Sequence, residues 1–202
     1  GPSGDGWKLA VVSGLADGLR RQIAGGLPTS MAALLAAPPT QLAGSVAGVR
    51  RVVVSATEIL RDPSKPVGER LAAIPMIEHL PDKDASALVA PLLSRLERTE
   101  IQQAALTTLT HMRLPFASAV IYQNLAGMGA EARTAAMQFL QRRPADLLQK
   151  IKEGVISLSL VDASSRWLFA NSSSAEMREL AGQLFGRAEG DRKALVARYT
   201  AT

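Results

Sequence analysis

Apolar residues recur at every third or fourth position along most of this chain, which is the spacing of one face of an α-helix. Near the start, Trp7, Val11, Leu15 and Leu19 form such a series, and Gly25-Gly26 then interrupts it. The pattern predicts helices near residues 7–23, 30–35, 40–60, 66–80, 82–96, 99–112, 115–127, 130–142, 144–154, 174–186 and 191–199, and one more that contains Trp167.

One pattern within these helices occurs three times at near-constant spacing, in copies that begin at Arg70, Gln102 and Arg133. Each copy carries two successive alanines, with apolar residues one and four places after the second alanine. A period of this length is typical of stacked helical hairpins, in which small residues let neighbouring helices approach closely. We therefore predict an all-α fold, a right-handed α-α superhelix of helical hairpins with irregular capping helices, whose repeats resemble the HEAT type.

Breaks in the pattern divide the chain. Residues 1–4, Gly-Pro-Ser-Gly, are typical of a cleavage remnant and linker, so we expect a longer parent protein. We predict an N-terminal helical cap at residues 5–62, three HEAT-like hairpins at 63–155 and C-terminal capping helices at 156–202, because the period fails beyond Gly154. Whether residues 5–62 continue the same stack stays open.

Prolines fall at two kinds of position in the predicted helices. Pro81, Pro115 and Pro144 stand near the starts of the second helices of the hairpins, where proline's fixed φ and missing N–H cost little. Pro75 and Pro91 fall inside predicted helices, and we expect them to kink these helices.

Composition narrows the class of protein. Apolar residues make up 47% of the chain, enough for a sizeable core, and the low aromatic content of 4% favours close-packed helices over a β-sandwich. Cysteine is absent, which excludes disulfides, thiolate zinc sites, iron–sulfur clusters and covalent haem attachment. No apolar run approaches the roughly 18 residues that span a bilayer, so we expect no membrane insertion of this chain.

The net charge of +5 is spread thinly, and the repeat region between residues 63 and 140 is neutral, with 7 basic and 7 acidic side chains. Solvated helix ends account for most short basic pairs. As an alternative function, such pairs could bind nucleic-acid phosphates, which predicts duplex binding that weakens steeply between about 50 and 200 mM salt. The residues of this alternative are Arg20, Arg21, Arg50, Arg51, Arg142 and Arg143.

Two histidines raise the question of a metal site. His79 and His111 stand at equivalent places in consecutive repeats, so neighbouring repeats could bring both rings to one ion. No acidic or cysteine ligand recurs at this spacing. We favour the interpretation that both end helices, where an imidazolium interacts with the helix dipole, and we expect no metal site.

Two carboxylate pairs have the residue types of a glycosidase acid and base, namely Asp82 with Asp84 and Glu97 with Glu100. Each pair also lies at a predicted helix start, where acidic side chains cap the helix or stabilise its dipole, and we favour that role. The run of serines at 172–174 offers hydroxyls without a neighbouring histidine, so it predicts a helix cap and not a nucleophile.

Aromatic and glycine residues add no further site. Trp7, Trp167, Tyr122 and Tyr199 could stack on bases or sugars, but three of the four lie in helical patterns beside aliphatic residues, so we expect core packing. No glycine-rich phosphate loop is present in the sequence. We therefore expect no catalytic residue, no cofactor-binding residue and no cofactor.

The C-terminal third, together with a few residues near the start, carries a narrower resemblance. The residues that carry it are Arg133-Thr134-Ala135-Ala136, Phe139-Leu140-Gln141-Arg142-Arg143-Pro144, Leu147-Leu148, Ile151-Lys152-Glu153-Gly154-Val155-Ile156, Arg166, Leu168, Leu184-Phe185-Gly186, Asp191-Arg192, Val196 and Tyr199, with Trp7 and Leu15-Ala16-Asp17-Gly18-Leu19 near the start. They resemble the helical region of large exported bacterial proteins, the planctomycete-type membrane-bound dehydrogenases, in which such a segment joins a glucose/sorbosone-dehydrogenase-like β-propeller to a c-type cytochrome domain. No Cys-x-x-Cys-His motif and no propeller repeat is present, so neither redox site carries over to any residue here.

The resemblance implies a location outside the cytoplasm, in the periplasm or cell envelope. It also implies a role, that of a non-catalytic scaffold that spaces or docks domains within a larger exported redox protein. The partners would be other domains of the parent chain or another protein, with no small-molecule ligand evident. An enzyme working in the groove of the stack is a third class, but polar residues of matching chemistry do not converge in the sequence.

Overall fold

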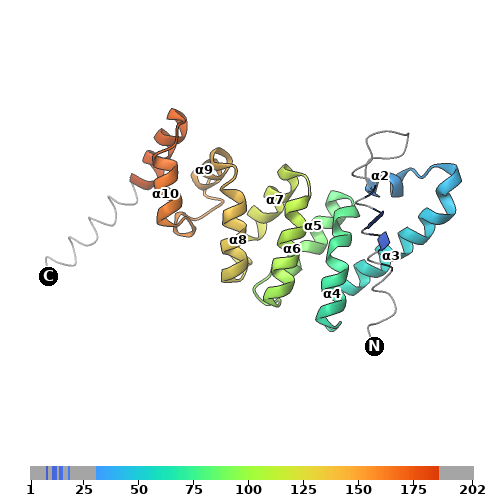
Figure 1. Ribbon diagram of the computed structural model, residues 1–202. Coiled ribbons are helices and arrows are strands. Elements are labelled where there is room, and N and C mark those ends of the chain that lie inside the picture. Colours follow the sequence, from blue (N-terminus) through green and yellow to red (C-terminus); the bar gives the residue numbers. More distant parts are fainter. Residues whose placement is uncertain (1–7, 9–10, 13, 16–17, 19–30, 187–202) are drawn as a thin grey trace. The chain divides into compact units, whose positions relative to one another are not determined.

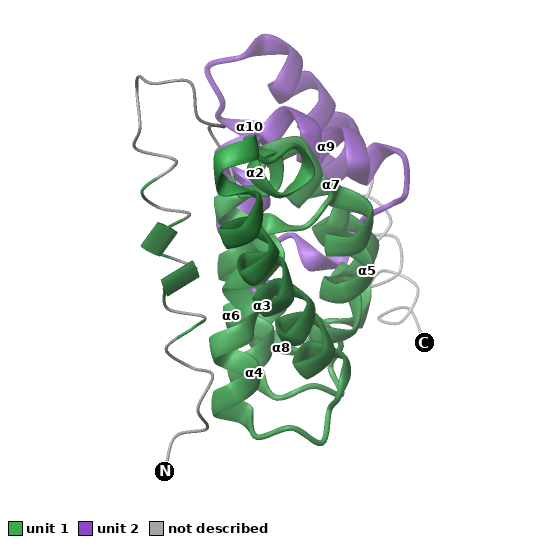
Figure 2. Cartoon of the chain, turned by 90° about the vertical axis from the view of Figure 1, so that its right-hand side faces the viewer, with its two compact units in different colours: residues 1–133 green, residues 134–202 purple. Residues whose placement is uncertain are grey.

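The computed structural model describes residues 8, 11, 12, 14, 15, 18 and 31–186 (Figure 1). Every regular element within these residues is a helix, so the predicted all-α class is confirmed. No helix in this part of the chain is long and apolar enough to cross a membrane. The chain forms two compact units, residues 1–133 and residues 134–202, coloured green and purple in Figure 2, and each is described by itself.

The first fully described helices of unit 1 are separated by a pair of prolines. Helix α2, Met31–Ala36, ends shortly before Pro38-Pro39, where consecutive prolines cannot continue a helix. A short 3₁₀ helix, η1 (Thr40–Leu42), then leads into α3, Ala43–Arg61. The β-branched valines at 52–54 lie within α3, because burial of Val53 in the core outweighs their β-propensity.

The repeat region of unit 1 consists of paired helices whose bounds lie close to the predicted ones. Like helices of successive pairs are neighbours, since α6 lies against α4 and η2, and α7 lies against α5. Helix α3 packs against α4, η2 and α5. The elements are α4 (Val67–Ala73), which continues as the 3₁₀ helix η2 (Ile74–His79), α5 (Asp82–Leu92), α6 (Thr99–His111) and α7 (Leu114–Asn124), which is followed by the 3₁₀ helix η3 (Leu125–Gly127).

Most prolines lie where the sequence placed them. Pro81 directly precedes α5, and Pro115 is the second residue of α7. Pro144 is the first residue of α9, Pro144–Lys152. Pro75 falls where α4 changes into η2, so the kink expected there takes the form of a change from α to 3₁₀ geometry.

Helix α5 is shorter than predicted, ending at Leu92 and not near residue 96. Pro91 lies inside the helix, as predicted, and is its penultimate residue. Beyond the end of α5, Arg95 donates its backbone N–H to the carbonyl of Gly127 at 2.7 Å and not to a carbonyl of α5.

The repeated alanines mark close contacts. Ala73, Ala105 and Ala136, the second alanine of each repeated pair, are fully buried. The apolar residue four places later is also buried in each copy, as Ile77, Leu109 and Leu140. The core of the repeat region therefore uses the positions that the pattern predicted.

Unit 2 continues with helices of similar length. Helix α8, Ala130–Leu140, crosses the boundary between the units, and α9 follows it. A 3₁₀ helix, η4 (Leu158–Leu160), leads to α10, Ala163–Ala170, and residues 175–186 form a further helix. The predicted helix at 191–199 lies outside the described residues.

Two turns in unit 2 have clear physical causes. Gly154 has a φ of +76°, its N–H bonds to the carbonyl of Ile151, and the N–H of Val155 bonds to the carbonyl of Lys150, so α9 ends in a Schellman motif. Asp162 caps α10, because its carboxylate accepts the backbone N–H of Ser165 at 2.8 Å.

Candidate functional site

The fourth residue of a helix makes the same hydrogen bond in three helices of this chain. In each helix its side chain donates to the backbone carbonyl five residues earlier, in the loop that precedes the helix. The bond gives the loop carbonyl a hydrogen-bond partner, which a backbone carbonyl near the core needs. We call this bond the first-turn clamp. The donor and acceptor pairs are Gln102 with Glu97 (2.8 Å), Arg133 with Met128 (2.9 Å) and Arg166 with Val161 (2.9 Å).

The clamp of Gln102 also joins two loops that are separated along the chain by α6 and α7. Its side chain is buried, and besides donating to Glu97, its Oε1 accepts the backbone N–H of Gly129 at 2.9 Å. The loop before α6 is thereby tied to the loop before α8. A Cβ atom at Gly129 would lie 3.0 Å from this Oε1, so the close approach favours glycine at this position.

Arg70 occupies the same fourth position in α4 but has an ionic partner. It is only 4% exposed, and its Nη2 forms an ion pair with Oε2 of Glu97. The Arg70 guanidinium is the main cause that holds the pKa of the Glu97 carboxyl below its usual value, while partial burial works in the opposite direction. The Arg70–Glu97 pair borders a hollow of about 270 Å³, and both groups serve to join α4 to the loop before α6.

Arg166 makes α10 a fourth copy of the local arrangement, one repeat period after Arg133. Its Nη2 also donates to the carbonyl of Leu158 at 3.0 Å, and its guanidinium lies 5.7 Å from the centre of the Phe185 ring. This copy does not show the repeated pattern in the sequence, because Leu168-Phe169 stands where the other copies have two alanines. The signal available in the sequence was Arg166 itself. It is a basic residue that stands four places after the capping Asp162 and one repeat period after Arg133.

The outward faces of these helices differ in polarity. On each helix this outward face consists of four residues. Counted along the chain from the clamp residue, they lie two places before it and one, two and five places after it. In α6 and α8 this face is formed by polar residues and alanine, and Gln103 of α6 donates to Glu131 of α8 at 3.2 Å. The outer stripe of α10, as we call it, consists of Ser164, Trp167 and Leu168 of the helix and of Asn171, which directly follows it.

Trp167 and Leu168 make the outer stripe of α10 apolar and exposed. The two residues are 65% and 59% exposed, respectively. The expectation that Trp167 packs in the core is therefore wrong. The reason is that the opposite side of α10 carries Ser165 and Phe169, which are buried, and residues two places from a buried one on a helix point away from it.

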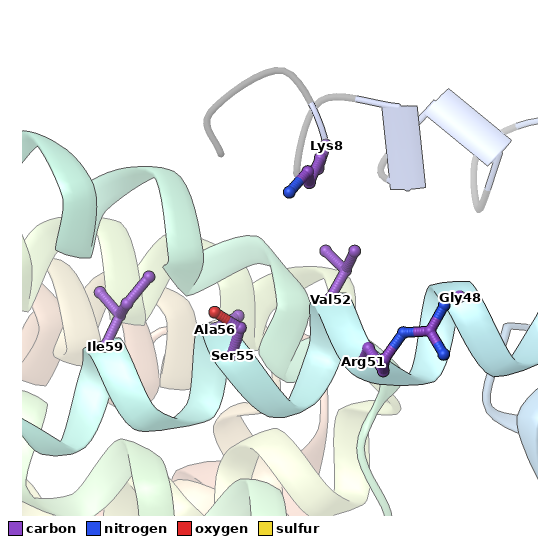
Figure 3. A pocket seen from close by; sticks show the side chains of 7 residues that line it. All are labelled: Lys8, Gly48, Arg51, Val52, Ser55, Ala56 and Ile59. Atoms are coloured by element: carbon purple, nitrogen blue, oxygen red, sulfur yellow. The ribbon is translucent and has the colours of Figure 1, made fainter. Parts of the chain in front are cut away.

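A hollow of about 360 Å³ lies along α3 in unit 1 (Figure 3). Figure 3 shows Lys8 extending from the N-terminal residues toward α3, over a floor of small and aliphatic side chains. Lys8 and Arg51 give the hollow a cationic rim, while Val52 and Ile59 supply apolar surface. Its lining residues are Lys8, Gly48, Arg51, Val52, Ser55, Ala56 and Ile59.

Both histidines end helices, as predicted. His79 is the buried last residue of η2, and His111 is the exposed last residue of α6. The Nδ1 of His111 lies 3.2 Å from Oε1 of Glu78. Among the described residues, no group of three histidine, cysteine, aspartate or glutamate side chains is placed to hold a metal ion.

Three of the four candidate carboxylates lie in first helical turns. Asp82 and Asp84 are exposed at the start of α5, where Asp82 forms an ion pair with Arg113, and Glu100 is exposed at the start of α6. Glu97 instead lies in the loop before α6 and pairs with Arg70, a contact that sequence spacing did not indicate. The serine run behaves as predicted, because Ser174 accepts the N–H of Met177 at 3.4 Å.

The arginines of the nucleic-acid alternative have separate local surroundings. Arg20 and Arg21 lie outside the described residues. Arg50 and Arg51 are exposed on α3 in unit 1, where Arg50 donates to the carbonyl of Leu35. Arg142 and Arg143 are exposed after α8 in unit 2, where Arg142 lies 5.8 Å from the centre of the Phe139 ring.

Comparisons with family models, with curated proteins and with solved structures found no match to this chain. Function is therefore inferred from the structure itself. Its relevant features are the first-turn clamps, the Arg70–Glu97 pair, the hollow along α3 and the outer stripe of α10. The clamps and the ion pair join helices to loops, whereas the outer stripe of α10 exposes apolar surface to solvent.

Proposed function

We propose that this chain is a non-catalytic helical scaffold, a HEAT-like α-α superhelix that spaces or docks domains within a larger exported redox protein. The observation that carries the proposal is that two buried polar side chains bond to loops between helices. Gln102 and Arg70, both at least nine-tenths buried, bond to loop carbonyls or to a loop carboxylate. Such contacts stiffen the junctions between successive helices, which is what a spacer requires.

The repeated spacing of the clamps supports an array of similar units. Arg70 and the three clamp residues are each the fourth residue of a helix, and they follow one another at nearly equal intervals, as Arg70, Gln102, Arg133 and Arg166. Arrays of this kind offer extended surfaces to partners, and the exposed Trp167 and Leu168 supply apolar contact area of the kind that interfaces use. The partners are proposed to be other domains of the parent chain or another protein.

The redox parent and the extracytoplasmic location rest on the sequence resemblance alone. Sequencing the parent gene across both ends of this segment tests them. A propeller-like region upstream and a Cys-x-x-Cys-His motif downstream are expected. A gene that encodes neither would contradict this half of the proposal.

The spacing role has a separate test that uses the absence of cysteine. We propose spin labels at Ala119→Cys in α7 of unit 1 and Ala170→Cys in α10 of unit 2, both exposed positions, with the distance distribution measured by pulsed electron resonance. The control pair, Ala87→Cys in α5 with Ala119→Cys, lies within unit 1 and reports the width that label motion alone produces. A spacer predicts equal widths for the two pairs. A much broader distribution between the units would show that the chain does not hold its ends at a set distance.

A further inference from the structure

The hollow beside the Arg70–Glu97 pair has the make-up of a small ligand site. It measures about 270 Å³ and is lined by residues of α3, α4, α5 and the loop before α6, all within unit 1. Leu60, Leu88 and Leu92 supply apolar wall, and the ion pair supplies polar groups. Binding sites for small molecules combine apolar walls with a few polar groups, and they usually exceed about 300 Å³. This hollow therefore suits a molecule about the size of a single ring.

The guanidinium of Arg70 has one donor left over. Arg70 is only 4% exposed, and its buried Nε–H has no hydrogen-bond partner within the part of the chain that the structure describes. Nε and Nη2 lie on the same edge of a guanidinium, and Glu97 takes only Nη2. A buried donor is unfavourable until an acceptor reaches it. The ion pair is thus incomplete on the donor side.

The carboxylate of Glu97 has acceptor capacity left. Its Oε2 pairs with Arg70, and its Oε1 accepts the backbone N–H of Arg98 at 2.9 Å. An ionised carboxylate offers about four lone-pair sites, so these two bonds do not saturate it. The Arg70–Glu97 pair therefore presents a hydrogen-bond donor and an acceptor next to each other at the hollow.

The charges around the hollow favour a neutral ligand. Helices α3 and α5 both end there, and a helix C-terminus carries partial negative charge. Pro91 adds to this at α5, because it has no N–H to donate to the carbonyl of Ala87. These groups oppose an anion beside Glu97, while the guanidinium of Arg70 opposes a cation. Arg61 is exposed at the end of α3, where it offsets the helix dipole and solvent screens its charge.

We propose that the hollow beside the Arg70–Glu97 pair binds a small neutral carboxamide that carries a compact apolar group. The amide oxygen accepts the Nε–H of Arg70, and the amide N–H donates to the carboxylate of Glu97. The apolar group packs against Leu60, Leu88 and Leu92. The proposal does not depend on the scaffold function, since every contact lies within unit 1.

Three probes of nearly equal size and different charge test the proposal on the full chain. Benzamide is the neutral amide, benzoate is an anion that offers only acceptors, and benzamidinium is a cation that offers only donors. Binding is followed by nuclear magnetic resonance through the backbone amide signals of Leu88 and Leu92. Ligands of this size have dissociation constants of about 1 mM. We expect benzamide to bind at least about tenfold more tightly than either ion, since each ion leaves one partner unbonded.

The Nε–H signal of Arg70 reports the contact directly. It is assigned by through-bond correlation to the Arg70 backbone. Benzamide is expected to shift this proton downfield and to slow its exchange with water, because the amide oxygen then accepts its hydrogen bond. If saturating benzamide leaves this signal unchanged, water is its partner and the proposal is overturned. Benzoate or benzamidinium binding as tightly as benzamide would also overturn it.

A substitution that narrows the hollow tests where the probe binds. Ala87→Leu adds bulk at an exposed lining position without altering the ion pair, and we expect it to weaken benzamide binding at least about tenfold. Ala119→Leu, at an exposed position of α7 that does not line the hollow, is the matched control and should leave binding unchanged. Urea denaturation verifies that both variants fold. Equal benzamide affinity of the two folded variants would show that the probe binds elsewhere and would contradict the proposed site.

Discussion

Helices α6 and α10 begin alike and differ on their outward faces. Each places its fourth residue, Gln102 or Arg166, so that the side chain donates to the carbonyl five residues earlier. The outward face of α6 is polar and bonds to α8 through Gln103, whereas that of α10 exposes Trp167 and Leu168. The loop-side chemistry is thus repeated, while the outward surface is free to vary. We therefore expect the residues that determine function to lie on the outward surfaces of the helices.

The two clamps also differ in their hydrogen-bond partners, since Gln102 bonds to two loops and Arg166 to one. We expect the largest loss of stability on replacing Gln102. Gln102→Met keeps the length of the side chain but leaves the Gly129 N–H and the Glu97 carbonyl without their partner. We expect the free energy of unfolding to fall by about 2 to 4 kcal/mol, measured by urea denaturation. Gln103→Met, one residue along on the exposed face, is the matched control and should change it by less than about 0.5 kcal/mol. Equal effects of the two substitutions would mean that the clamp has no special role.

Arg166 should be less critical, because its acceptors lie within its own loop. Arg166→Met removes two bonds, to the carbonyls of Leu158 and Val161, and is expected to cost about 1 to 2 kcal/mol. Arg143→Met, an exposed arginine of the same unit, serves as the control and should be nearly neutral. Thermal unfolding of both variants followed by circular dichroism provides the measurement. If Arg166→Met lowered the free energy of unfolding as much as Gln102→Met does, the proposed distinction between the two clamps would be wrong.

The loops that lead to the clamps differ as well, since only the one before α10 contains a described residue with positive φ. Gly154→Ala is expected to destabilise unit 2 by about 1 kcal/mol, because an L-residue with a side chain is strained at a φ of +76°. Gly182→Ala, at an open and exposed position of the helix at 175–186, should stabilise it by about 0.5 to 1 kcal/mol. Effects of the same sign in chemical denaturation would contradict this account of the turn.

Among the fourth-position side chains, Arg70 is the one whose partner contributes a pH dependence. The pKa of Glu97 is lower in the folded chain than its ordinary value of 4.5, so the unfolded chain takes up this proton more readily. The stability that the Arg70–Glu97 pair supplies is therefore complete above that value and is lost as the pH falls through the lowered folded pKa. Glu97→Gln should flatten the fall in unfolding free energy below about pH 4.5, measured by urea denaturation at several pH values.

Removing the cation provides the matching control. Arg70→Met should flatten the same part of the pH profile, and the double variant should add little to either single change. Additive effects of the two substitutions would show that the carboxylate and the guanidinium do not act as a pair.

Much of the helical architecture followed from the amino-acid sequence alone. The 3.6-residue period and the positions of Pro81, Pro115 and Pro144 placed the helices to within a few residues, because hydrophobic periodicity and the preference of proline for helix starts are local properties. The buried alanines 73, 105 and 136 were also correctly placed, since small residues at a fixed period mark helix contacts.

The clamps, the Arg70–Glu97 pair and the exposure of Trp167 became visible only in three dimensions. A glutamine that bonds to Gly129 and an arginine that pairs with Glu97 each reach a partner far along the chain, and nothing in their local sequence marks that partner. Likewise, Trp167 and Phe169 stand two places apart in one apolar run, and the neighbours of α10 decide which of them is buried. Local chemistry sets where helices form, whereas long-range packing decides which face of each helix meets a neighbour and which remains available for a partner.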